Sequence, residues 1–182
     1  MNYELPAAVT PSEARIHPSS ILVLGLGNPI LGDDGVGWRV AEEVRSATAG
    51  QAQPPDVDCA ALGGLSLMER MLGYGRVILV DSMWTGTNPE GSVRVCALDD
   101  LQNPGAGHTA SPHDTSLVTA LRTAEMMGAA VPQRVDIVAI ETRACYDFSE
   151  TLTPAATSAL PIATRKVLEL LGEFAAADNR GS

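Results

Sequence analysis

Short apolar runs alternate with amphipathic segments along this chain of 182 residues. Four of the apolar runs predict buried strands, at residues 21–24, 57–61, 76–82 and 135–140. Segments with apolar residues at helical spacing lie between and after them, at residues 38–47, 65–72, 114–127 and 154–174. Strands that alternate with helices indicate a mostly parallel sheet that is covered by helices on both faces.

The segment 92–98 also has strand character, but the connection before it, residues 83–91, is too short to hold a crossover helix. It must therefore return antiparallel, either as a hairpin partner or as a strand at the edge of the sheet. The predicted fold is a three-layer α/β/α sandwich with a five-stranded, mostly parallel, twisted sheet and one antiparallel strand. We expect a single domain over residues 20–174, a flexible N-terminal extension at 1–19 and a polar tail at 175–182.

Composition and charge narrow the range of partners. The formal net charge is −10, whereas binding to a nucleic-acid backbone needs clustered Lys and Arg. No apolar run approaches the roughly 20 residues of a membrane helix, and no signal peptide is visible at the start of the chain. Cys59, Cys96 and Cys145 are odd in number and far apart, as expected for reduced thiols. We expect a cytoplasmic protein without nucleic-acid or membrane partners, and a monomer, since no long apolar surface stripe is evident.

Residues 21–37, ILVLGLGNPILGDDGVG, join the first strand to the first helix. Gly25 and Gly27 permit a tight turn, and two acids, Asp33 and Asp34, stand at the entrance to the helix. An aspartate in such a place usually caps the helix, which is the structural alternative. In an open α/β sheet, however, ligands bind at the carboxyl ends of the strands, so this junction is a candidate site. A dinucleotide is disfavoured, because the third glycine of the GxGxxG motif is missing and the acids repel a pyrophosphate.

Three polar residues stand where this layout places functional groups: Asp34 after the first strand, Asp81 at the end of the third, and His113 before a helix. The first and third strands are expected to be neighbours, which brings their carboxyl ends together. Two carboxylates and an imidazole form a borderline ligand set for Ni²⁺ or Zn²⁺, and a dication between the acids relieves their repulsion. The structural alternatives are a cap for Asp81 and a solvated helix-start residue for His113. His108 lies in the same loop as His113 and is its rival.

These residues match a known family. The chain resembles the hydrogenase maturation endopeptidases, which trim the C-terminal extension from the large subunit of nickel-iron hydrogenases. The resemblance implies a three-layer α/β/α fold with a five-stranded mixed sheet, and metal-contacting roles for Asp34, Asp81 and His113. It covers about residues 21–171 and rests on five motifs: LGLGNPILGDDGVG, Gly63-Gly64, ILVD at 78–81, Ser111-Pro112-His113 and Leu152-Thr153-Pro154.

The resemblance also implies how the enzyme works. It contacts the nickel already present in its substrate to locate the cleavage point, so the three side chains meet that metal without holding it permanently. The sequence has no HExxH motif and no Ser/His/Asp arrangement, so a water activated near the ion or by a carboxylate is the expected nucleophile, in a metal-guided or aspartic-type hydrolysis. Gly63 and Gly64 leave room for a substrate strand; the alternative is an ordinary turn. The family has a glycine shortly after its histidine, where this chain has Ser116.

Two other functions share parts of this pattern. Peptidyl-tRNA hydrolases also carry GLGNP after a first strand, here residues 25–29, but the acid pair that follows and the net charge of −10 suit a tRNA partner poorly. A non-cleaving, nickel-sensing chaperone of the hydrogenase subunit would use the same ligand set. An activity assay on the nickel-loaded precursor separates that chaperone from an endopeptidase.

Overall fold

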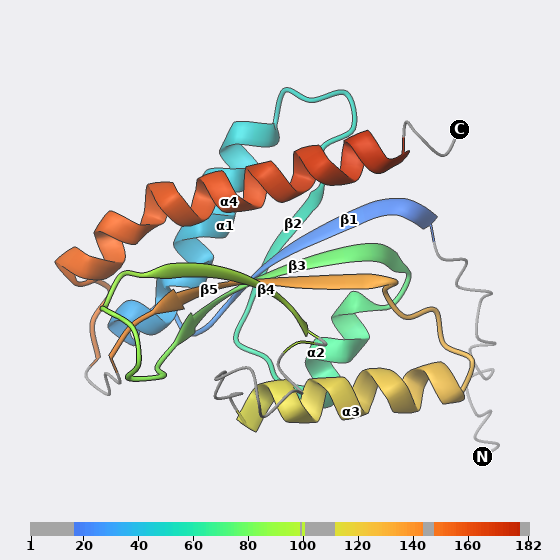
Figure 1. Ribbon diagram of the computed structural model, residues 1–182, viewed down its shortest axis with the longest axis horizontal. Helices are drawn as coiled ribbons and strands as arrows, with labels where there is room; N and C mark the ends of the chain where they lie inside the picture. Colours follow the sequence, from blue (N-terminus) through green and yellow to red (C-terminus); the bar gives the residue numbers. More distant parts are fainter. Residues whose placement is uncertain (1–16, 99, 101–111, 144–147, 179–182) are drawn as a thin grey trace, which may run out of the picture.

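The computed structural model of the protein describes residues 17–98, 100, 112–143 and 148–178. They form one five-stranded sheet between two layers of helices (Figure 1). Within this part of the chain, no helix combines the length and the apolar character that crossing a membrane requires. The elements are, in order, β1 (His17–Leu26), the 3₁₀ helix η1 (Gly32–Gly35), α1 (Val36–Thr48), β2 (Asp56–Ala60), α2 (Gly64–Met71), β3 (Tyr74–Met83), β4 (Val93–Ala97), α3 (Pro112–Met126), β5 (Arg134–Glu141) and α4 (Pro154–Asp178).

The strand order is β2-β1-β3-β5-β4, with β4 antiparallel to β5 and all other neighbours parallel. This arrangement confirms the predicted sandwich with one antiparallel strand. β4 lies at an edge and pairs with β5, so it is not a hairpin partner of β3. β1 and β3 are neighbours, with Leu24 beside Leu79 and Gly25 beside Val80. Their carboxyl ends therefore lie side by side, as the sequence predicted.

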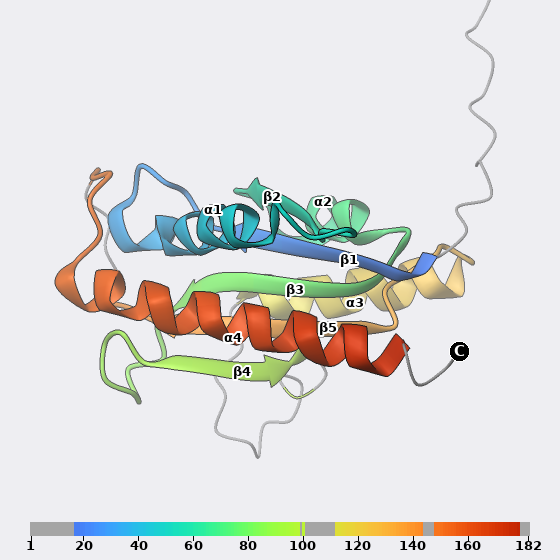
Figure 2. The ribbon, with the colours of Figure 1, turned by 90° about the horizontal axis from the view of Figure 1, so that it is seen from above.

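Alternate residues of the central strands point to opposite faces of the sheet and build two cores. On one face Val23, Ile78 and Val138, all buried, pack with α1 and α4. On the other face Leu24 and Leu79 pack with α2 and α3. Figures 1 and 2 show these two pairs of helices on opposite sides of the sheet. Because both faces are covered, the edges and the two ends of the sheet are the places where a ligand can reach it.

The ends of the domain differ from the predicted boundaries. β1 begins at His17, inside the predicted extension 1–19, because its first residue pairs with the first residue of β3. α4 continues to Asp178 and so includes part of the predicted tail 175–182. The three alanines at 175–177 explain this difference, since alanine has the strongest intrinsic preference for helix.

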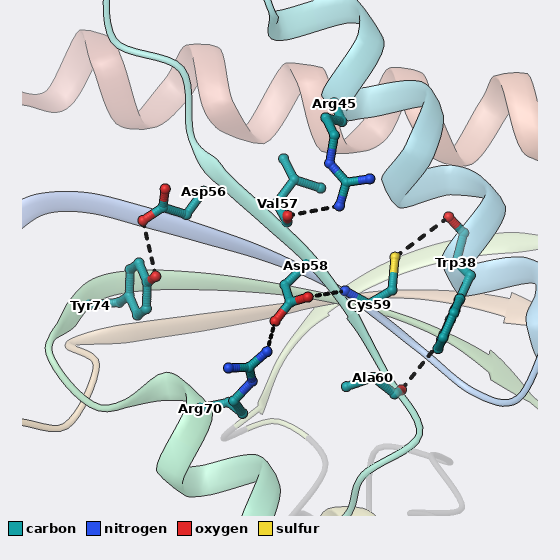
Figure 3. Close-up of polar contacts among 9 residues, drawn as sticks. All are labelled: Trp38, Arg45, Asp56, Val57, Asp58, Cys59, Ala60, Arg70 and Tyr74. Atoms are coloured by element: carbon teal, nitrogen blue, oxygen red, sulfur yellow. Dashed lines mark hydrogen bonds and ion pairs between the residues drawn. The ribbon is translucent and has the colours of Figure 1, made fainter.

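The outer edge of β2 is covered by side chains (Figure 3). The carbonyl of the last residue of β2 faces β1, so the backbone groups of Val57 and Cys59 face outward. The Val57 carbonyl accepts a hydrogen bond from Arg45 Nη2 at 2.9 Å, and the Cys59 amide donates to Asp58 Oδ1 at 2.8 Å. These contacts occupy backbone groups that another strand would otherwise pair with.

The described cysteines, Cys59 and Cys96, form no disulfide bond. Burial raises the pKa of the Cys59 thiol and outweighs the opposite effect of the neighbouring Arg45. Cys59 is therefore protonated at neutral pH. Cys145 lies outside the described residues.

Candidate functional site

The turn after β1 depends on glycines that permit very close packing. Gly27 has a positive φ of 112°, and a Cβ atom there would overlap the backbone carbonyl of Asp34. A Cβ atom on Gly37, near the start of α1, would overlap the carbonyls of Leu26 and Val80. Both of those carbonyls lie near the carboxyl ends of the two central strands. The acid pair in η1 is therefore held directly against this end of the sheet.

The first acid of the pair, Asp33, has a structural role. Its side chain is buried, and its carboxylate accepts two hydrogen bonds from Thr153, from the amide at 2.7 Å and from Oγ1 at 2.8 Å. Thr153 directly precedes α4, and its Oγ1 accepts a hydrogen bond from the amide of Ala156, as an N-cap does. Asp33 thus ties η1 to the start of α4, and this contact occupies both of its carboxylate oxygens.

The second acid, Asp34, is partly exposed and lies at the end of β3. Its Oδ2 accepts a hydrogen bond from the amide of Asn28 at 2.6 Å, and its Oδ1 accepts one from Ser82 Oγ at 3.3 Å. Both donors are neutral, so the carboxylate is oriented without being neutralised. Ser82 follows Asp81 in β3, and the contact therefore joins the two strand ends from which the site was predicted.

Asp81 lies within β3 and does not end it, because the strand continues to Met83 and pairs with β5 along this whole stretch. By the alternation of the strand, the side chain of Asp81 is on the same face as Leu79 and Met83, toward α2 and α3. Ser82 is on the opposite face, toward α1 and α4. Asp34 and Asp81 thus approach the end of β3 from its two faces.

His113 is the second residue of α3, so it lies within the helix and not before it. α3 packs on the same face as Asp81, and its last residues lead into the start of β5. The first turn of α3 is therefore directed toward the carboxyl ends of the strands (Figure 1). The side chain of His113 lies outside what the structure describes, and so does His108. The convergence of Asp34, Asp81 and His113 stays a prediction.

The two glycines predicted to admit substrate follow β2. Gly63 has extended backbone and Gly64, with a φ of 56°, begins α2. Two large apolar side chains beside them, Leu62 and Leu65, are exposed. Their position at the carboxyl end of β2 is compatible with substrate binding, and this role stays a prediction. Among the described residues, no group of three or more His, Cys, Asp or Glu side chains is arranged to hold a metal ion.

Glu141, the last residue of β5, is not among the site residues predicted from the sequence. Its carboxylate is 3% exposed and accepts hydrogen bonds from the amides of Thr85 (2.7 Å) and Gly86 (3.0 Å) and from the Thr85 hydroxyl (2.9 and 2.7 Å to the two oxygens). Burial by itself raises the pKa of Glu141, but the hydrogen bonds from Thr85, Gly86 and Asn88 outweigh it and lower the pKa. The available signal was an acid that closes the apolar run VDIVAI.

Large apolar side chains are exposed in the loops that follow several parallel strands. These loops, after β1, β3 and β5, gather at one end of the molecule, at the left in Figures 1 and 2. The amide of Ser149 donates to the carbonyl of Ile30 at 2.9 Å, which ties the loop before α4 to the loop after β1. Exposed apolar side chains beside a polar site are typical of surfaces that bind polypeptides. In these three loops the exposed apolar side chains are Ile30 after β1, Trp84 after β3 and Phe148 after β5. Leu62, after β2, is also exposed.

The chain is similar in sequence to known proteins over most of its length. The profile of a family described as hydrogenase maturation protease matches residues 38–170. The hydrogenase expression/formation protein HupD of Rhizobium leguminosarum bv. viciae is 26% identical over 157 residues, which cover 86% of this chain and 76% of that protein. HupD of Rhodobacter capsulatus is 26% identical over 154 residues, which cover 85% of this chain and 72% of that protein.

Solved structures share the fold. The hydrogenase maturating endopeptidase HybD from E. coli superposes with a TM-score of 0.65 at 24% identity, over 85% of this chain and 93% of that chain. The hydrogenase 2 maturation peptidase of a Thaumarchaeota archaeon superposes with a TM-score of 0.56 at 29% identity, over 84% of this chain and 98% of that chain. Because the profile match covers well over half of its residues, the chain belongs to the hydrogenase maturation protease family.

Proposed function

We propose that the protein is an endopeptidase that removes the C-terminal extension from the nickel-loaded precursor of a nickel-iron hydrogenase large subunit. Membership of the maturation protease family supports this proposal, and it sets aside the peptidyl-tRNA hydrolase alternative. The observation that carries it is the Asp34 carboxylate, which is partly exposed at the end of β3 and oriented by two neutral donors. A carboxylate held in this way keeps its charge for a cation brought by a partner.

The proposed chemistry is peptide hydrolysis guided by the metal of the substrate. Asp34, Asp81 and His113 contact the nickel of the precursor, and Gly63 and Gly64 leave space for the chain to be cut. A water molecule, activated near the ion or by one of the carboxylates, attacks the scissile carbonyl carbon. The C–N bond then breaks, the new carboxyl end retains the water oxygen, and a proton passes to the leaving amine.

The proposed partner is a precursor that is already folded around its nickel site, and the protein meets it in the cytoplasm as a monomer. The absence of a disulfide bond at Cys59 and Cys96 suits such a reducing compartment. Light scattering on the purified protein in dilute solution tests the monomer. A stable dimer would contradict this part of the proposal and leave the cleavage chemistry unaffected.

The deciding experiment incubates the purified protein with nickel-loaded precursor and, in parallel, with the same precursor prepared without nickel. Mass spectrometry then follows the loss of the C-terminal peptide. We expect cleavage of the nickel-loaded precursor alone. Equal cleavage of both precursors would contradict the metal-guided mechanism. A stable complex with the loaded precursor, without any peptide loss, would favour the non-cleaving chaperone.

A further inference from the structure

Trp84 is a large aromatic residue placed in solvent at the end of the sheet that holds the candidate site. It is 66% exposed and follows β3, three residues after Asp81. Exposing an indole to water is unfavourable, so such a residue on a rigid segment calls for an explanation. Trp84 has no role in the proposed cleavage chemistry.

The backbone on both sides of Trp84 is fixed. On one side the Met83 carbonyl accepts a hydrogen bond from the amide of Thr142 at 2.8 Å. On the other side the amide of Thr85 donates to Glu141 Oε1 at 2.7 Å. Trp84 is thus held between two contacts that both reach the end of β5, so its exposure does not result from a loose loop.

The anchor on the second side is a buried carboxylate. Glu141 is 3% exposed, and besides the Thr85 amide it accepts hydrogen bonds from the Thr85 hydroxyl and from the amide of Gly86. Burying a carboxylate costs free energy unless it is fully hydrogen-bonded, so these hydrogen bonds are what allows Glu141 to be buried here. The donors Thr85, Gly86 and Asn88 all belong to the segment that follows Trp84, and the carboxylate therefore fixes this loop.

The indole itself lies close to the anchored backbone. Gly86 has a positive φ of 68°, and a Cβ atom there would lie 4.0 Å from Nε1 of Trp84. The chain thus passes close to the indole nitrogen at a residue without a side chain. Because Glu141 also binds the amide of Gly86, the carboxylate fixes the backbone segment beside the indole.

We infer that Trp84 contacts the substrate, and that Glu141 is a positioning residue which holds Trp84 ready to bind an apolar segment of the precursor polypeptide. This inference rests on the proposed function and names a second element of substrate recognition besides the metal. A tryptophan on an anchored backbone loses less conformational freedom on binding than one on a mobile loop, and tryptophans are frequent among the residues that dominate protein interfaces.

Fluorine NMR tests the contact without relying on activity. The chain has only two tryptophans, so protein labelled with 5-fluorotryptophan gives two resonances. The second, Trp38, lies on α1 with its indole nitrogen 3.5 Å from the Ala60 carbonyl (Figure 3), and the variant Trp38→Phe identifies its resonance. On addition of unlabelled precursor we expect the Trp84 resonance to shift. An unrelated protein added at the same concentration is the control and should leave it in place. Binding of the precursor with an unshifted Trp84 resonance would overturn the inference.

Kinetics test whether the contact matters for recognition. Trp84→Ala should raise KM for the precursor about tenfold, in the range found for interface hot spots, and leave kcat nearly unchanged. Met127→Ala is the matched control, because Met127 is 81% exposed just after α3 and away from this loop. It should change neither constant. An unchanged KM in Trp84→Ala would contradict the inference.

A double-mutant cycle tests the positioning role of Glu141. Glu141→Gln should raise KM in the otherwise native protein and add nothing when Trp84 is already alanine. A role in stability alone would lower the melting temperature and leave KM unchanged in both backgrounds, which would overturn the positioning role. If the native protein fails to cut the loaded precursor but the Trp84 resonance still shifts, the proposed cleavage fails and the contact stands.

Discussion

The charged side chains at the two ends of the sheet differ in the kind of partner that they have. At the amino end, Arg76 and Arg134 lie over the ring of Phe174, each with its guanidinium carbon 5.1 Å from the ring centroid. Arg134 also forms an ion pair with Asp136, with Nε 2.7 Å from Oδ2, and Arg76 donates to the Phe174 carbonyl. These charges are satisfied by other groups of the same chain, and they fasten α4 to the strands.

At the carboxyl end, Asp33, Asp34 and Glu141 receive hydrogen bonds from amides and hydroxyls. Neutral donors orient a carboxylate and leave its negative charge in place. Of these three carboxylates Asp33 and Glu141 are buried, whereas Asp34 is partly exposed. We therefore expect the amino end to serve stability, and Asp34 at the carboxyl end to meet the cation of the proposed substrate. Four predictions test this division.

The largest expected effect is at the amino end. Phe174→Ala removes a buried ring and both cation–π contacts, and should lower the free energy of unfolding by about 3–5 kcal/mol. Urea denaturation measures the loss. Phe148→Ala is the control, because that ring is exposed and its removal should change stability by about 0.5 kcal/mol or less. A lower kcat in the folded fraction of Phe174→Ala would show that the two ends are not independent.

The next effect concerns cleavage. Asp34→Asn keeps the size of the side chain and removes its charge, so processing of the nickel-loaded precursor should fall about a hundredfold or more. Stability should change little, because the site is partly exposed: the amide oxygen can still accept from the Asn28 amide, and the amide nitrogen can donate to Ser82 Oγ. Processing rates and urea denaturation on the same preparation separate the two quantities. Normal cleavage by Asp34→Asn would remove the central residue from the proposed site.

The neighbouring acid should behave in the opposite way. Asp33→Asn puts an amide where a buried carboxylate accepts two hydrogen bonds, so we expect a loss of about 1–3 kcal/mol in stability. Processing by the molecules that stay folded should fall much less than in Asp34→Asn. If Asp33→Asn and Asp34→Asn lose cleavage equally and neither loses stability, Asp33 does not have the purely structural role assigned to it.

The smallest effect depends on pH. The pKa of folded Glu141 is below its ordinary value of 4.5, so the unfolded chain binds a proton at Glu141 more readily than the folded chain. The stability from Glu141 is therefore present above pH 4.5 and is lost as the pH falls through the lower pKa of the folded state. Glu141→Gln should flatten the fall in unfolding free energy over this acidic range. An equally steep fall in the variant would contradict the lowered pKa.

The sequence predicted the fold well because its signals are local. Compact apolar runs, glycine turns and helical spacing all report on the conformation of a few neighbouring residues. The pairing of β4 was left open, because a short connection excludes a parallel neighbour without naming the antiparallel one. The last turn of α4 was not predicted, because the polar residues that follow the three alanines at 175–177 indicate a tail.

Parts of the site depend on partners that are distant along the chain. The adjacent Asp33 and Asp34 look equivalent in sequence, and they are distinguished by Thr153, 120 residues away from Asp33. Glu141 acquires its role from Thr85, 56 residues earlier. No periodicity reports such pairs, so the sequence alone does not distinguish the buried carboxylate that ends β5 from an acid in the loop after the predicted strand.

The covered edge of β2 has a consequence for aggregation. Arg45 occupies the Val57 carbonyl and Asp58 occupies the Cys59 amide, so a stray segment of chain must break both contacts before it can extend the sheet there. If the protein acts on immature precursors as proposed, it is exposed to such segments whenever it binds one. Because no strand is added at the edge of β2, the sheet does not act as a template for aggregation of the precursor.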